Sequence, residues 1–111
     1  MKYLNESQIA NKIKSYCRTH DILCITPSNV PIGFPDLICL CNGFFIAIEV
    51  KTKQGRLSHV QKGLHREFLV SGALVYIVRS LDQFIALIDT FLRLPNLKRL
   101  IDDYKKGTRY A

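Results

Sequence analysis

The chain has no long hydrophobic run, and this absence limits where the protein can reside. None of its 111 residues belongs to an apolar stretch of about eighteen, the length that a membrane-spanning helix needs. The N-terminal residues also lack the apolar segment of a signal peptide. No repeat, low-complexity tract or linker divides the sequence, and its 48% hydrophobic content is typical of one globular domain. We therefore expect a single domain, residues 1–111, in the cytoplasm.

The four cysteines form no Cys-x-x-Cys pair and no pattern typical of secreted disulfide proteins. Cys39 and Cys41 lie two apart in an apolar run, so a strand would point both to one face. We expect all four cysteines to be small buried hydrophobes in a reducing compartment. No set of ligands has the spacing of a tetrahedral zinc site, so we expect no zinc.

Acidic residues are few, and their distribution is uneven. Lysine and arginine number 16 against 9 aspartates and glutamates, which gives a net charge of +7. This excess favours nucleic acid as the partner, with an acidic lipid surface as the weaker alternative. One stretch holds five basic residues and no acid: Lys51, Lys53, Arg56, Lys62 and Arg66.

Helix-capping residues precede three amphipathic segments. Asn5, Ser58 and Ser80 are each followed three residues later by glutamine, which is the pattern of a capping box. The apolar spacing then predicts helices over about residues 6–19, from residue 58 to Gly72, and from residue 80 to Pro95. A last helix is expected after Asn96.

Four β-rich runs complete the pattern, at residues 22–26, 36–41, 44–51 and 73–79. Asn42-Gly43 joins the second and third of these runs and is the strongest short-range signal of a β-hairpin. The order is α-β-β-β-α-β-α-α. It predicts an α/β fold in which a mixed sheet with a central hairpin is flanked by helices.

A two-residue turn at Asn42-Gly43 would place Asp36 directly opposite Glu49, and Lys51 would share their face. Two opposed carboxylates repel by roughly 3 kcal/mol at about 5 Å, and a divalent cation would reverse that cost. Mg²⁺ bound there could activate a water and neutralise charge on a phosphate, with Lys51 orienting the water or stabilising the transition state. The alternative is that Asp36 is a turn residue and that Glu49 and Lys51 form a solvated strand end.

Gly33-Phe34-Pro35-Asp36 followed by Glu49-Val50-Lys51 resembles the PD-(D/E)XK nuclease signature. The agreement extends to the order of elements and to Arg56-Leu57-Ser58-His59, Gln61 and Gly72. This longer string is similar to the VRR-NUC (virus-type replication-repair nuclease) branch, over roughly residues 6–80. The resemblance implies a restriction-endonuclease-like core with the order α-β-β-β-α-β.

The resemblance also implies roles for single residues. Asp36 and Glu49 match the metal-binding carboxylates, the Val50 carbonyl a further ligand and Lys51 the catalytic lysine. Glu6 matches a metal-site glutamate on the first helix, although a first-turn glutamate also stabilises the helix dipole. Gln61 matches a catalytic-site glutamine, although the Ser58 capping box explains it equally well. We expect His59 and His65 to be solvated helix residues and His20 to lie at a helix end.

Minimal members of this branch, often phage-encoded, imply a homodimer that cuts branched DNA such as Holliday junctions in a bacterial or phage-infected cell. We therefore expect a Mg²⁺- or Mn²⁺-dependent, structure-selective DNA endonuclease with no small-molecule cofactor, whose phosphate contacts come from Lys53, Arg56, Lys62 and Arg66. The alternatives are a non-catalytic DNA-binding scaffold and a flap or restriction-type nuclease. The apolar residues Phe84, Ile85, Ile88, Phe91, Leu92 and Leu97 are candidates for the dimer interface or for the core.

Overall fold

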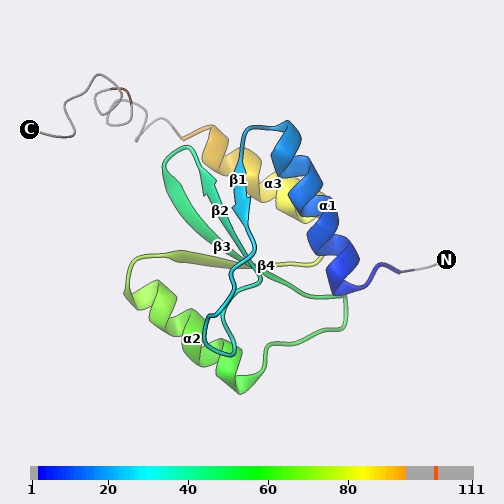
Figure 1. The fold of residues 1–111 in the computed structure, drawn as a ribbon, viewed down its shortest axis with the longest axis vertical. Helices are drawn as coiled ribbons and strands as arrows, with labels where there is room; N and C mark the ends of the chain where they lie inside the picture. Colours follow the sequence, from blue (N-terminus) through cyan, green and yellow to red (C-terminus); the bar gives the residue numbers. More distant parts are fainter. Residues whose placement is uncertain (1–2, 95–101, 103–111) are drawn as a thin grey trace, which may run out of the picture.

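The structure is a computed structural model that describes residues 3–94 and residue 102. In chain order its elements are α1 (Glu6–Thr19), β1 (Leu23–Ile25), β2 (Leu37–Cys41), β3 (Phe44–Val50), α2 (His59–Val70), β4 (Leu74–Val78) and α3 (Leu81–Leu92) (Figure 1). This order confirms the sequence prediction through α3. The last predicted helix, after Asn96, lies outside the described residues apart from Asp102. None of the helices in the described part is long and apolar enough to cross a membrane.

The four strands form one mixed sheet in chain order, with β4 parallel to β3 and the other neighbours antiparallel. Asn42 and Gly43 both have positive φ, 51° and 84°, as the tight hairpin turn requires. The predicted register is confirmed, because Cys41 lies opposite Phe44 and Leu37 lies opposite Ile48. The next position outward from this ladder brings Asp36 to Glu49.

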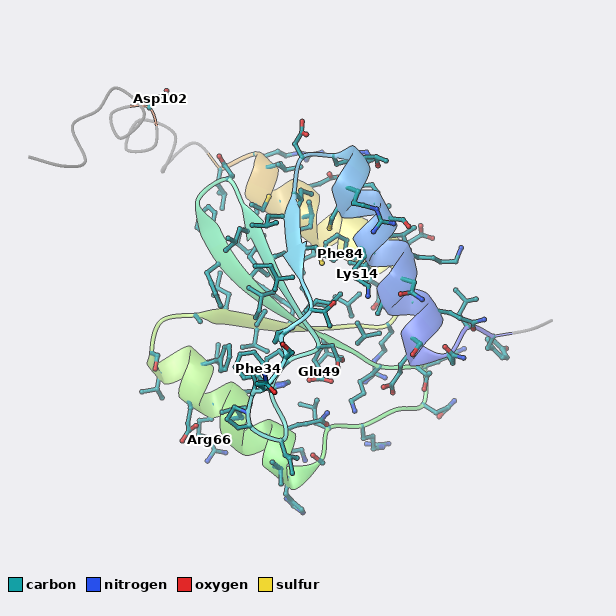
Figure 2. All side chains as sticks on the ribbon, viewed as in Figure 1. Lys14, Phe34, Glu49, Arg66, Phe84 and Asp102 are labelled. Carbon is teal, nitrogen blue, oxygen red and sulfur yellow. The ribbon has the colours of Figure 1, made fainter. Side chains whose placement is uncertain are left out.

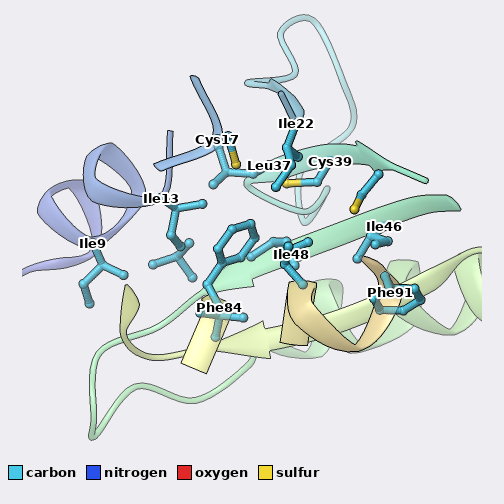
Figure 3. Close-up of a cluster of buried hydrophobic side chains, with 14 residues drawn as sticks. Ile9, Ile13, Cys17, Ile22, Leu37, Cys39, Ile46, Ile48, Phe84 and Phe91 are labelled. Atoms are coloured by element: carbon cyan, nitrogen blue, oxygen red, sulfur yellow. The ribbon is translucent and has the colours of Figure 1, made fainter. Parts of the chain in front are cut away.

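Helices α1 and α3 cover one face of the sheet, and α2 covers part of the other (Figure 1). The main core lies under α1 and α3, where Ile13, Phe84 and Ile88 pack against Ile46 and Ile48 (Figure 3). All five side chains are fully buried. The apolar residues of α3 therefore belong mainly to the core, which is one of the two interpretations of that segment. Leu92 is exposed, and Leu97 lies outside the described residues.

The predicted capping boxes at Asn5 and Ser58 are complete. The prediction of a third capping box at Ser80 was wrong for one of its two hydrogen bonds. The Ser80 hydroxyl does accept from the Gln83 backbone, but the Gln83 side chain accepts from Arg79 N–H at 2.8 Å instead of from Ser80. The backbone at Ser80 is nearly extended (φ −159°, ψ 161°), which brings the N–H of the preceding residue, Arg79, within reach of the Gln83 side chain.

The long loop between β1 and β2 packs against α2, at Val60 near its start and at Phe68 near its end, and so fixes the entry to β2. Gly33 has φ +91°, and a Cβ there would lie 2.8 Å from the Val60 side chain and 3.0 Å from its carbonyl. Phe34 contacts Phe68 of α2 edge to face, with ring centroids 5.0 Å apart. These contacts hold Pro35, which is buried, and place Asp36 immediately before β2.

Candidate metal centre

Asp36 and Glu49 meet at one end of the hairpin, as the register predicted. Asp36 Oδ2 accepts a hydrogen bond from the Val50 backbone N–H at 2.8 Å, which leaves its second oxygen for another partner. The Asp36 side chain is exposed, whereas Glu49 is only 1% exposed. Glu49 lies on the side of the sheet that α2 covers (Figure 2). A carboxyl group so deeply buried needs partners, because desolvation disfavours its charged form.

Two residues of α2 supply those partners. His65 Nε2 lies 3.2 Å from Glu49 Oε1, and Gln61 Nε2 donates to Glu49 Oε2 at 3.2 Å. The two side chains are four residues apart and therefore lie on one face of the helix. Gln61 also completes the capping box through its Oε1, which accepts from Ser58 N–H at 2.9 Å. The Gln61 side chain therefore completes the capping box and also contacts Glu49, so the two interpretations of this residue are compatible.

The prediction for His65 was wrong, because its side chain is buried against Glu49. Sequence spacing offered one signal that could have found it: His65 follows Gln61 by one helical turn and so shares the face that meets the carboxylate. His59 is exposed at the first position of α2, as expected. His20 caps the end of α1, also as expected, with Nδ1 2.8 Å from the Tyr16 carbonyl.

The electrostatics of this site favour a cation. Burial, followed by the neighbouring Asp36 carboxyl and the more distant Glu6, raises the pKa of Glu49 to about 8, although Lys51 opposes the shift. Burial also lowers the pKa of His65; the negative charge of Asp36 opposes this shift, and the positive charge of Lys51 adds to it. At neutral pH the imidazole is therefore neutral, and Glu49 lacks sufficient positive charge to offset its burial.

Glu6, on the first turn of α1, is directed toward the same region. It lines a cavity of about 300 Å³ together with Lys14, Thr26, Asp36 and Val50. The structure therefore brings the predicted Glu6, Asp36 and Val50 to one cavity, with Glu49 adjoining Asp36. In the described part of the chain, the three carboxyl groups do not all lie within 4.8 Å of one another. The donors are carboxylate and carbonyl oxygens, which are the ligands that Mg²⁺ and Mn²⁺ prefer, so the residues fit such a cation.

Lys14 is a basic residue of this cavity that the sequence prediction missed. Its Nζ lies 3.5 Å from the hydroxyl of Thr26, the first residue of the β1–β2 loop. Lys14 follows Glu6 by about two helical turns, so both side chains fall near the same face of α1. A lysine there can meet a phosphate that approaches the carboxylates.

The predicted basic residues lie on the loop after β3 and on α2. Lys51 is half-buried, and its backbone N–H donates to the Val78 carbonyl at 3.0 Å. The others are exposed: Lys53, Arg56, Lys62 and Arg66. Arg79 holds the loop that carries Lys53, because its guanidinium donates to the carbonyls of Thr52 and Gly55, the latter at 2.8 Å. After Lys14, Arg79 is the second residue near the site whose role the sequence prediction missed, because it fixes the loop that carries Lys53.

Comparison with known proteins agrees with this architecture. No protein-family model matches the sequence, and no curated protein matches it significantly. Among the solved structures that match its fold, two are described as VRR_NUC domains. The first, described as "VRR_NUC domain protein", has a TM-score of 0.72 and 18% identity, over 85% of this chain and 93% of its own. The second, "VRR_NUC domain", has a TM-score of 0.67 and 26% identity, over 76% of this chain and 94% of its own. The chain therefore has the fold of a VRR-NUC domain over most of its length.

Proposed function

We propose that this domain, which has the VRR-NUC fold, is a divalent-metal-dependent endonuclease that hydrolyses phosphodiester bonds in DNA. The observation that carries the proposal is the buried Glu49 carboxyl, held by His65 and Gln61 beside the Asp36 carboxyl. A protein without a cation at this place gains nothing from such an arrangement, because ionising the buried Glu49 beside a second carboxyl group costs several kcal/mol unless the charge is compensated. The VRR-NUC-type fold of the two matched structures supports the same activity.

Glu6, Asp36, Glu49 and the Val50 carbonyl are the residues that would hold Mg²⁺, with Mn²⁺ as its substitute. When bound, the cation supplies an activated water at neutral pH and offsets the negative charge that develops on the phosphate. Asp36 and Glu49 are the catalytic carboxylates in this proposal. His65 and Gln61 are positioning residues, because they fix both oxygens of Glu49 and would affect the reaction only by orienting that carboxyl group.

Lys51 is the catalytic lysine in this proposal. It follows Glu49 by two residues at the end of β3, and its ammonium is close enough to influence the pKa values of both Glu49 and His65. Its backbone is fixed to β4 through the Val78 carbonyl. From this position it can donate to a phosphate oxygen or orient the attacking water.

The DNA-binding surface would consist of the exposed basic residues Lys53, Arg56, Lys62 and Arg66, together with Lys14 at the cavity. Such contacts neutralise phosphates and release counterions, so affinity falls steeply with salt. They do not read base edges, which favours selection of DNA by its structure.

We further propose a homodimer, because one domain offers one cut and a two-fold pair offers two symmetric cuts on a junction. The support is an apolar row across the sheet. Leu23 pairs with Leu40, which pairs with Phe45, and these three side chains are 56%, 39% and 46% exposed. A row of exposed apolar residues on neighbouring strands marks an interaction surface. We therefore propose Holliday junctions as the substrate of this pair.

The test is cleavage of labelled four-way junction, flap and linear duplex DNA, with Mg²⁺, Mn²⁺ or EDTA. The proteins are the unmodified chain, Asp36→Asn, and Asp82→Asn as a matched control on the first turn of α3. We expect paired metal-dependent cuts in the junction, lost in Asp36→Asn and kept in Asp82→Asn. Cuts in flap or duplex alone would retain the nuclease and remove the junction-resolving role. Salt-sensitive binding without any cut would instead establish the non-catalytic scaffold.

A further inference from the structure

Three of the four cysteines come together in the fold although they are far apart in the sequence. Cys17 lies on α1, Cys24 on β1 and Cys39 on β2, and their sulfur atoms all lie within 4.8 Å of one another. The register explains the arrangement, because Cys24 pairs directly with Cys39 and both point to the face that α1 covers. Figure 3 shows Cys17 and Cys39 in the part of the core between α1 and the sheet.

The distances suit a single cation bound by thiolates. In a tetrahedral zinc site the sulfur atoms lie about 2.3 Å from the metal and therefore about 3.8 Å from one another. Sulfur atoms within 4.8 Å need to move by less than about 1 Å to reach that geometry. Cys17 and Cys39 are buried, whereas Cys24 is partly exposed, so a metal would enter and a fourth ligand would bind on the Cys24 side.

Of the three thiols, only Cys24 lies in surroundings that favour the thiolate, whereas hydrogen bonding within the cluster and burial raise the pKa values of Cys17 and Cys39. The pKa of the Cys24 thiol is lowered, because the Cys17 and Cys39 thiols donate hydrogen bonds to it and because Lys14 and Arg18 of α1 lie nearby. Three thiolates and Zn²⁺ carry one net negative charge, and these two cations would offset it. Thiolate sulfur is a soft ligand that selects Zn²⁺ or Cu⁺ over Mg²⁺.

We propose that Cys17, Cys24 and Cys39 form a second metal site, specific for a thiophilic cation such as Zn²⁺ and separate from the carboxylate centre. The bound cation would join α1 to the β1–β2 edge of the sheet at the end of the helix opposite Glu6. It would therefore stabilise the placement of the helix that carries Glu6. The site does not depend on the proposed nuclease activity, because none of its three ligands belongs to the carboxylate centre.

The test is titration of the reduced, metal-free full chain with Co²⁺, in excess Mg²⁺ so that hard-oxygen sites are occupied. We expect thiolate-to-cobalt charge-transfer absorption and tetrahedral ligand-field bands that saturate at one Co²⁺ per chain and are abolished by Zn²⁺. Cys24→Ser should lose these bands. Cys41→Ser is the matched control, because Cys41 is buried on the same strand as Cys39 but lies outside the cluster; it should keep them, as should Asp36→Asn.

Two further measurements do not depend on a cysteine variant that folds. Stoichiometric Zn²⁺ should raise the Tm of the unmodified chain by about 5 °C or more, as expected for a ligand that binds only the folded state. Zn²⁺, but not Mg²⁺, should also protect the Cys24 thiol from alkylation under native conditions. Absence of charge-transfer absorption, equal absorption in Cys24→Ser, or alkylation of Cys24 that Zn²⁺ does not change would each overturn the proposal. The cysteines would then contribute packing alone.

Discussion

The Glu49 carboxylate lies 3.2 Å from His65 Nε2, and both side chains are buried between the sheet and α2. The imidazole holds Glu49 Oε1 while Gln61 holds Oε2, so the orientation of this carboxylate is set by α2. Partners of this kind fix the geometry of a metal ligand and tune its basicity. The helix after β3 is therefore part of the proposed metal centre, although its residues would not bind the metal.

Replacing His65 should weaken metal binding. His65→Ala removes a hydrogen bond to Glu49 and leaves a cavity, so the Mg²⁺ concentration for half-maximal cleavage should rise about 10- to 100-fold. His65→Gln retains a donor and should recover part of the loss. The measurement is the cleavage rate as a function of Mg²⁺ concentration, with His59→Gln as the control on the exposed side of α2. Equal Mg²⁺ dependence in His65→Ala and the unmodified chain would contradict this role.

The metal-free protein should lose stability as the pH rises. The pKa of Glu49 is about 8 in the folded state against an ordinary value of 4.5, so between these pH values the folded state keeps a proton that the unfolded state has lost. The free energy of unfolding should therefore fall by a few kcal/mol from about pH 5 to pH 8 and level off above pH 8. Urea unfolding in EDTA measures it.

The control for this prediction is Glu49→Gln, which removes the titrating group. Its free energy of unfolding should not show the fall caused by Glu49, and it should exceed that of the unmodified chain at pH 8. His65 acts in the opposite direction and only below its ordinary pKa of 6.5, because its folded pKa is lowered and the unfolded state takes up the proton first. Parallel curves for both proteins above pH 6.5 would show that Glu49 ionises normally in the fold.

The sequence was sufficient to predict the elements of this fold because local signals were strong at each boundary. Asn42-Gly43 fixed the hairpin register, and the register alone placed Asp36 beside Glu49. Contacts between distant segments could not be predicted in this way. The burial of His65 depends on how α2 packs on the sheet, and the meeting of Cys17 with Cys24 depends on the docking of α1.

Two glycines of neighbouring segments should respond in opposite directions to alanine. Gly33→Ala adds a Cβ at φ +91° and within 3.0 Å of the Val60 backbone, so it should destabilise the protein by about 2 kcal/mol or more. Gly63 lies inside α2, and a Cβ added there would meet no atom within 4 Å, so Gly63→Ala should stabilise by about 1 kcal/mol. Urea unfolding measures both. Cleavage should fall only in Gly33→Ala, because the Gly33 loop positions Asp36.

The proposed dimer should depend on the apolar row of Leu23, Leu40 and Phe45. Leu40 is the central member, paired with both others and 39% exposed, so Leu40→Lys places a charge in the middle of the surface without entering the core. We expect the unmodified chain to have twice the monomer mass in light scattering, and Leu40→Lys to be a folded monomer. Val70→Lys is the control, because Val70 is 83% exposed at the end of α2 and outside the row.

If the monomeric variant still cuts DNA, single cuts should replace the paired cuts in a four-way junction, because each chain has its own carboxylate centre while the two-fold axis aligns the two cuts. A Leu40→Lys protein that remains dimeric would place the interface elsewhere on the molecule.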